Sequence, residues 1–130
     1  KRKMGFLGTC ILLNESGDQV VVQDLFPGSV LLSPDGSGIV HSIIQNEYCR
    51  EDLTELSTAL TVANSQLVAR RGSSYKWGVP QAWESAQRSV GGISHRSKGH
   101  ITFTVVLEDG CVVVSACGTR CRSSTRSFKE

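Results

Sequence analysis

The feature that most constrains the fold lies near the end of the chain, where two alternating segments flank a tight-turn dipeptide. The segments His100–Glu108 and Cys111–Cys117 alternate between apolar and polar residues, as half-buried strands do. Asp109-Gly110 between them is a preferred two-residue hairpin turn, because both central residues need positive φ. Such a turn would pair apolar residues on one face: Leu107 with Val112, Val105 with Val114, and Phe103 with Ala116. The sequence therefore predicts a β-hairpin over residues 100–117.

This hairpin bears on the five cysteines, which are Cys10, Cys49, Cys111, Cys117 and Cys121. Cys111 and Cys117 would share a face but lie about 20 Å apart, whereas a disulfide needs its Cα atoms within about 7 Å. No CxxC pair is present, so neither a zinc ribbon nor another metal site is expected. We expect reduced thiols and an intracellular protein, although Asn14-Glu15-Ser16 is a glycosylation sequon.

The first 44 residues suggest short strands separated by turns. The apolar segments 5–13 and 19–26 are joined by Asn-Glu-Ser-Gly-Asp at 14–18, which is turn chemistry, so they predict a hairpin. Proline and glycine in the segment 33–36 predict a second turn, and residues 39–44 predict the strand that follows it.

The middle of the chain predicts two helices. Between residues 51 and 71 apolar residues recur every three or four positions, at Leu53, Leu56, Leu60, Ala63 and Leu67. Acidic residues begin this segment and arginines end it, as the helix dipole favours. An alternative is that residues 59–62 and 66–69 are strands flanking a tight turn at 64–65. A shorter helix is predicted over 80–90, where proline suits the first helical position.

These elements predict an α+β fold, with a mostly antiparallel sheet of about five or six strands packed by one longer and one shorter helix. The 130 residues suit one globular domain, expected over 1–119, with a basic, serine-rich tail over 120–130. The body from 4 to 119 holds seven basic and eleven acidic residues, whereas both ends are basic. No apolar run approaches the roughly 18 residues of a membrane-spanning helix, so no membrane partner is expected.

Catalytic signatures are missing from the sequence. The three histidines stand apart from any GxSxG or known cysteine-nucleophile context. Gly36 and Gly38 resemble half of a phosphate-binding loop, but no GK[ST] follows them. We therefore expect a protein that is not an enzyme and needs no cofactor.

The most distinctive stretch interleaves cations with aromatic residues, and a second basic loop follows it. The predicted partner-binding residues are Arg70, Arg71, Tyr75, Lys76, Trp77, Arg96 and Lys98. Arginine and tryptophan dominate protein interfaces, and unpaired sheet edges also recruit partners. The favoured function is a protein–protein interaction or assembly module that can self-associate, of the kind found within larger scaffold or viral proteins. The alternative is single-stranded nucleic-acid binding, with cations on phosphates and aromatic rings on bases. A further alternative is that Trp77 only packs the core.

The first part of the chain resembles PDZ domains in the order of its features. Gly5-Phe6-Leu7-Gly8 comes first, then Phe26-Pro27-Gly28-Ser29, then a predicted helix ending before Leu67-Val68-Ala69-Arg70. In that family a glycine-bearing loop binds the carboxylate of a peptide's C-terminus, and the peptide adds a strand beside a helix. The resemblance covers about the first 70 residues and implies peptide binding as a third possibility.

Overall fold

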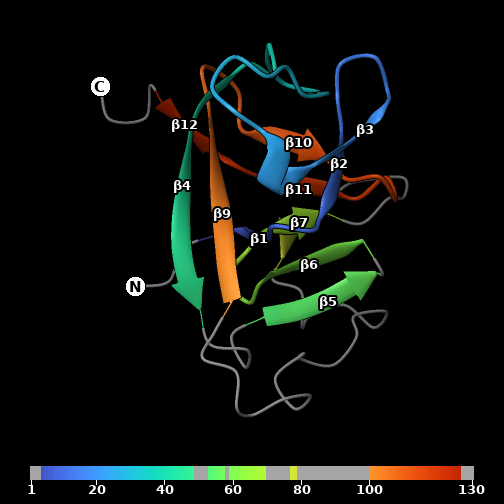
Figure 1. The fold of residues 1–130 in the computed structure, drawn as a ribbon. Helices are drawn as coiled ribbons and strands as arrows, with labels where there is room; N and C mark the ends of the chain where they lie inside the picture. Colours follow the sequence, from blue (N-terminus) through green and yellow to red (C-terminus); the bar gives the residue numbers. More distant parts are fainter. Residues whose placement is uncertain (1–3, 49–52, 58, 70–76, 79–99, 127–130) are drawn as a thin grey trace.

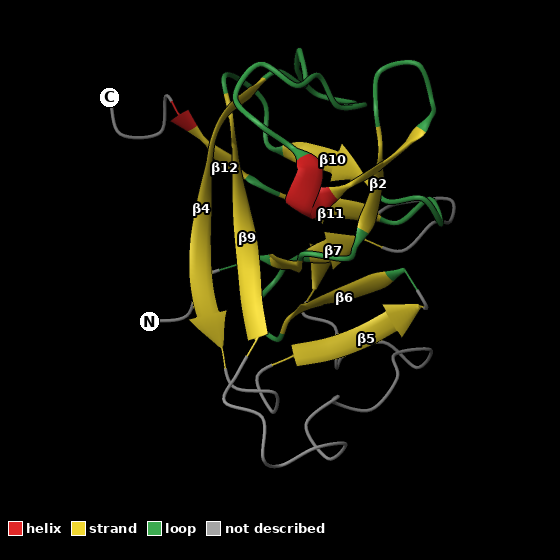
Figure 2. Cartoon of the chain, in the orientation of Figure 1, coloured by secondary structure: helices red, strands yellow, loops and turns green. Residues whose placement is uncertain are grey.

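A computed structural model describes residues 4–48, 53–57, 59–69, 77–78 and 100–126. Within these ranges the regular structure is almost entirely β, and the helical residues are the 3₁₀ turn η1 at Val22–Asp24 and Arg126 just after β12 (Figure 2). The predicted α+β class is therefore wrong: the structure is a mostly antiparallel β fold. The predicted shorter helix over 80–90 lies outside the described residues.

The larger sheet is built around the long strand β9. Its members are β1 (Phe6–Leu7), β4 (Val40–Tyr48), β5 (Leu53–Ser57), β6 (Leu60–Ala63), β9 (His100–Leu107) and β12 (Ser124–Thr125). β4 runs antiparallel along the whole of one side of β9. β1 pairs antiparallel and β12 parallel on the other side, and β6 and β5 continue the sheet beyond β1 (Figure 1).

A second sheet and a hairpin complete the fold. The second sheet has the order β10 (Val112–Val114), β11 (Arg120–Arg122), β7 (Val68–Ala69) and β8 (Trp77–Gly78). The hairpin pairs β2 (Ile11–Leu13) with β3 (Gln19–Val21), so the predicted first hairpin is confirmed there. Residues 120–125, which were expected in the tail, instead supply β11 and β12 to the two sheets.

One apolar core lies between these parts. Its buried side chains come from every part of the fold: Phe6, Leu12, Val22, Leu31, Val40, Leu60, Val62, Val68, Val105, Leu107, Val113, and the thiols of Cys10 and Cys121. Burial of such side chains contributes roughly 1.5–3 kcal/mol each. Because both sheets and the hairpin contribute, none of them buries its apolar face alone.

The predicted hairpin over residues 100–117 is wrong. Both edges of β9 are already occupied, by β4 on one side and by β1 and β12 on the other, so β10 pairs with β11 instead. The Asp109-Gly110 turn also lacks the positive φ that a two-residue hairpin turn requires at both central residues. Gly110 has φ +74°, but no described residue other than glycine has positive φ. Cys111 and Cys117 therefore do not share one strand, since Cys117 lies in the turn that joins β10 to β11.

The predicted longer helix is wrong as well, because its residues form β5 and β6. Leu53 pairs with Ala63 and Thr54 with Val62 in an antiparallel ladder. β6 lies between β1 and β5, and Val62 and Ala63 are both fully buried. Burial at consecutive positions removes the two-residue alternation that identifies a strand. The alternative prediction, two strands flanking a turn at residues 64–65, is closer to the structure. These strands are β6 and β7, but they belong to different sheets and do not pair with each other. Without this helix, the PDZ resemblance loses one wall of its peptide groove.

Candidate functional site

Of the predicted partner-binding residues, the structure describes only Trp77. The other six lie outside the described residues: Arg70, Arg71, Tyr75, Lys76, Arg96 and Lys98. Trp77 is half-buried in β8, where it pairs with Ala69. Its ring lies 4.5 Å from the guanidinium carbon of Arg122, a cation–π contact. Trp77 therefore contacts Arg122, a cation that the sequence analysis placed in the basic tail.

The edge of β4 is the longest unpaired strand edge in the described structure. Among the described residues, the outward backbone hydrogen bonds of β4 are at its start, where Val40 donates its N–H to Ser29 O and accepts from Gly28 N, both at 2.8 Å. From Ser42 to Tyr48, β9 is the one described strand that pairs with β4, and Figure 1 shows β4 along the outer side of the sheet. Ile44 on this edge strand is 47% exposed. This segment offers backbone donors and acceptors to another strand.

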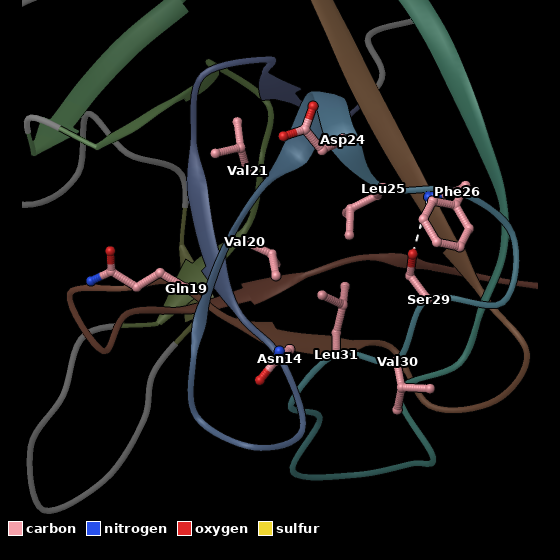
Figure 3. Close-up of a pocket in the computed structure, with 10 residues that line it drawn as sticks. All are labelled: Asn14, Gln19, Val20, Val21, Asp24, Leu25, Phe26, Ser29, Val30 and Leu31. Atoms are coloured by element: carbon pink, nitrogen blue, oxygen red, sulfur yellow. Dashed lines mark hydrogen bonds between the residues drawn. The ribbon is translucent and has the colours of Figure 1, made fainter.

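An apolar groove lies beside the β2–β3 hairpin and has a volume of about 420 Å³ (Figure 3). Half of its lining residues are aliphatic, among them Val20, Leu25 and Val30, and Asp24 is the one acidic residue among those that line it. Phe26 lines it as well and is 63% exposed, and the backbone N–H of Phe26 donates to Ser29 Oγ at 3.1 Å. The groove can accept an apolar side chain, but its lining offers no cation or histidine for chemistry.

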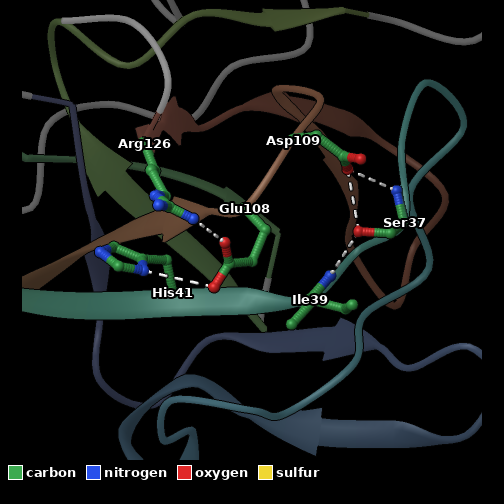
Figure 4. A network of polar contacts seen from close by, with 6 residues as sticks. All are labelled: Ser37, Ile39, His41, Glu108, Asp109 and Arg126. Atoms are coloured by element: carbon green, nitrogen blue, oxygen red, sulfur yellow. Dashed lines mark hydrogen bonds and ion pairs between the residues drawn. The ribbon is translucent and has the colours of Figure 1, made fainter. Parts of the chain in front are cut away.

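Two aspartates hold the turn before β4 against the turn after β9. The Asp35 carboxylate accepts hydrogen bonds from the backbone N–H groups of Cys111 and Val112, at 3.1 Å each. Asp109 accepts in return from the N–H and hydroxyl of Ser37, at 2.7 and 2.8 Å (Figure 4). The turns approach so closely at Gly36 that a Cβ there would lie 2.8 Å from Asp109 O. The Asp-Gly sequence at 109–110 thus fastens two loops together.

The electrostatics of this region are those of a structural clamp. Burial opposes the ionisation of Asp35, but hydrogen bonds from Cys111, Ser33 and Val112 outweigh it and lower the pKa of its carboxyl. Beside the clamp, Arg126 binds Glu108 at 2.6 Å and His41 Nδ1 lies 3.3 Å from the same carboxylate (Figure 4). The hydrogen bond from Arg126 is the main cause of the lowered pKa of Glu108. The ion pairs of Glu108 with Arg126 and His41 lie at the surface, so they contribute little to stability.

The contacts of His41, the metal-ligand groups and the helices of the described residues bear on catalysis, metal binding and membrane spanning. His41 hydrogen-bonds to Glu108 rather than to a serine or cysteine. No group of three or more histidines, cysteines or acids in the described ranges could hold a metal ion. No helix in the described part of the chain is long and apolar enough to span a membrane.

The four described cysteines are free thiols, and their environments differ. Burial raises the pKa of Cys10 to about 11 and raises that of Cys121 further above the ordinary value. Partial burial also opposes ionisation of Cys117, but hydrogen bonds from Ser115 and Thr119 outweigh it and lower its pKa. Cys117 is exposed and its pKa is lowered, so we expect it to react faster than the buried thiols of Cys10 and Cys121.

Comparison with known proteins adds no assignment. No protein-family model matches the sequence, and a search of curated proteins found no significant match. The candidate surfaces are therefore assigned from geometry. The sequence prediction missed β4 as an unpaired edge, because edge position depends on strand order. It missed Arg122 although Arg120-Cys121-Arg122 shows the polar–apolar alternation of a strand.

Proposed function

We propose that the chain is a non-catalytic interaction module that associates with a second copy of itself along β4. The observation that carries this proposal is the edge from Ser42 to Tyr48 of a nine-residue strand, which no other described strand pairs with. Antiparallel pairing of two such edges would join two sheets across a two-fold axis, with backbone hydrogen bonds as the main attraction.

The side chains of β4 suit one register of this pairing. With the two-fold axis at Ile44, the two exposed isoleucines meet. Ser42 then lies opposite Asn46 of the second copy, and Ile43 lies opposite Gln45. No acid faces another acid in this register, and favourable cross-strand pairs contribute roughly 0.2–1 kcal/mol each. The exposed apolar centre and the charge pattern therefore both support a second copy as the occupant.

The expected association is weak and reversible. A single edge of seven residues buries less surface than a permanent dimer does. A dissociation constant in the micromolar to millimolar range, or about −8 to −4 kcal/mol, is expected for the isolated chain.

The test is the average mass by light scattering and sedimentation equilibrium over a range of concentrations. The wild-type mass should rise with concentration, and Ile44→Lys should remain monomeric because edge lysines block strand pairing. Ile101→Lys is the matched control: Ile101 is 49% exposed, but it lies on β9, whose two edges are occupied. It should associate like the wild type. A wild-type monomer at about 1 mM, or equal association of Ile44→Lys, would contradict the proposal.

The nucleic-acid alternative stays a prediction, since six of its seven residues lie outside the described ranges. Binding to phosphates would weaken steeply as salt is raised, whereas pairing along β4 would not. Titration with a single-stranded oligonucleotide at two salt concentrations separates the two functions.

A further inference from the structure

A second cavity opens where β11 leads into β12, on a part of the molecule that the β4 proposal does not use. Its volume is about 350 Å³, which lies in the range of small-molecule sites. The residues that line it and carry the argument are Met4, Leu67, Cys111, Arg122, Ser123 and Ser124. A second, much smaller pocket shares the lining residues Met4, Arg122, Ser123 and Ser124.

The cavity contains a positive charge without an acidic partner. Among the described residues, Arg122 forms no ion pair, and its guanidinium is held against the Trp77 ring at 4.5 Å. Its Nε is buried and has no hydrogen-bond partner. Arg126, four residues later, is bound by Glu108 at 2.6 Å. A partly desolvated cation without a counter-charge is costly, so Arg122 favours an anion in the cavity.

One of the lining residues also carries a buried hydroxyl group without a partner. Ser123 is 5% exposed, and its Oγ makes no hydrogen bond. Buried hydroxyls are normally paired with protein or with ordered water. A ligand oxygen that reached the Ser123 hydroxyl would accept a hydrogen bond that no described group accepts. Arg122 and Ser123 therefore both select for an acceptor that carries negative charge.

The walls restrict the ligand to one with an apolar body. Met4 and Leu67 are the apolar residues that line the cavity. One guanidinium can balance one negative charge, whereas a doubly charged phosphate would keep an unbalanced charge beside apolar walls. We propose that this cavity binds a small monocarboxylate, with its carboxylate on Arg122 and Ser123 and its short aliphatic chain on Met4 and Leu67.

Cys111 makes this site directly testable, because it is among the residues that line the cavity. The experiment measures the rate of iodoacetamide alkylation of each cysteine by mass spectrometry, with hexanoate as the probe. Occupancy slows the modification by a factor of 1 + [L]/Kd, so a Kd of about 1 mM predicts about tenfold protection of Cys111 at about 10 mM hexanoate. Cys117, in the β10–β11 turn, is not among the lining residues and is the internal control.

Two arginine variants separate the site from a general charge effect. Arg122→Gln should abolish the protection of Cys111, whereas Arg126→Gln should retain it. The buried thiols of Cys10 and Cys121 report on folding in the same samples, since they are unreactive while the core is intact. Should Arg122→Gln expose them, Ser123→Ala replaces it and is expected to reduce the protection several-fold.

Three results would overturn the proposal. The first is an unchanged alkylation rate of Cys111 at saturating hexanoate, which would show an unoccupied cavity. The second is equal protection by hexanol, which would show an apolar cavity that needs no anion. The third is equal protection by inorganic phosphate, which would show a general anion site.

Discussion

Replacing Gly38 by alanine tests how tightly the loop before β4 is packed. Gly38 has φ +80°, and a Cβ built on it would lie 1.9 Å from the carbonyl oxygen of Leu31. The same two residues form a backbone hydrogen bond, from Leu31 N to Gly38 O at 2.8 Å. Because the obstacle is backbone rather than a flexible side chain, the two segments must move apart by more than 1 Å to restore an ordinary contact of roughly 3.5 Å.

Gly17→Ala is the matched control, since Gly17 has φ +86° but no atom within 4 Å of the added Cβ. It should destabilise by the left-handed backbone cost of roughly 1–2 kcal/mol, reduced by the roughly 0.4–1 kcal/mol that alanine removes from the entropy of the unfolded chain. Gly38→Ala adds the loss of one hydrogen bond and looser packing of the buried Leu31, for a total of about 2–4 kcal/mol.

The assay is urea unfolding of both variants at 25 °C, with the free energy of unfolding extrapolated to water. The expected difference between the variants is about 1–3 kcal/mol, with Gly38→Ala the less stable. Equal destabilisation would refute the close approach of Gly38 to Leu31, because the two variants share the backbone cost and differ only in the contact.

Three further predictions concern other parts of the fold. Asp35→Asn should destabilise by about 1 kcal/mol after allowance for solvent screening. Because the folded pKa of Asp35 is lowered, its contribution is present above the unfolded pKa of about 3.9 and is lost as the pH falls below it, so Asp35→Asn should flatten the acid limb of stability against pH. Cys117 should react with a disulfide reagent at pH 7.5 before Cys10 does, and the reverse order would contradict the burial of Cys10. Phe6→Ala should cost about 3–5 kcal/mol and the half-buried Phe103→Ala less, as measured by chemical unfolding; equal losses would place Phe103 in the core.

Short-range signals in the sequence identified several elements correctly. The Asn-Glu-Ser-Gly-Asp stretch at 14–18 joins β2 to β3, and Gly17 adopts the positive φ that such a turn requires. The turn over 33–36 and the strand after it are present as well. These features depend on neighbouring residues, and turn chemistry therefore specifies them.

Long-range pairing was not accessible in the same way. The alternation of residues 100–107 identified β9 as a strand, but it could not tell which strands would pair with it. The sequence predicted a hairpin turn at Asp109. The role of Asp109 in the structure is to accept hydrogen bonds from Ser37, and that contact joins residues 72 positions apart in the sequence. Arg122 was missed because its place beside Trp77 is created by the pairing of β7 with both β8 and β11.

The first and last strands of the larger sheet meet only through β9, and this sets the order of assembly. Phe6 pairs with Phe103, and the Thr104 hydroxyl binds the carbonyl of Met4 across 100 residues of sequence. During synthesis, β1 can pair with β6, but β4 must wait for β9 before it has its partner in the sheet, so folding is expected to be slow. The nascent chain therefore exposes both edges of β4 until β9 has been made, and a chaperone that shields β4 should raise the yield of native protein.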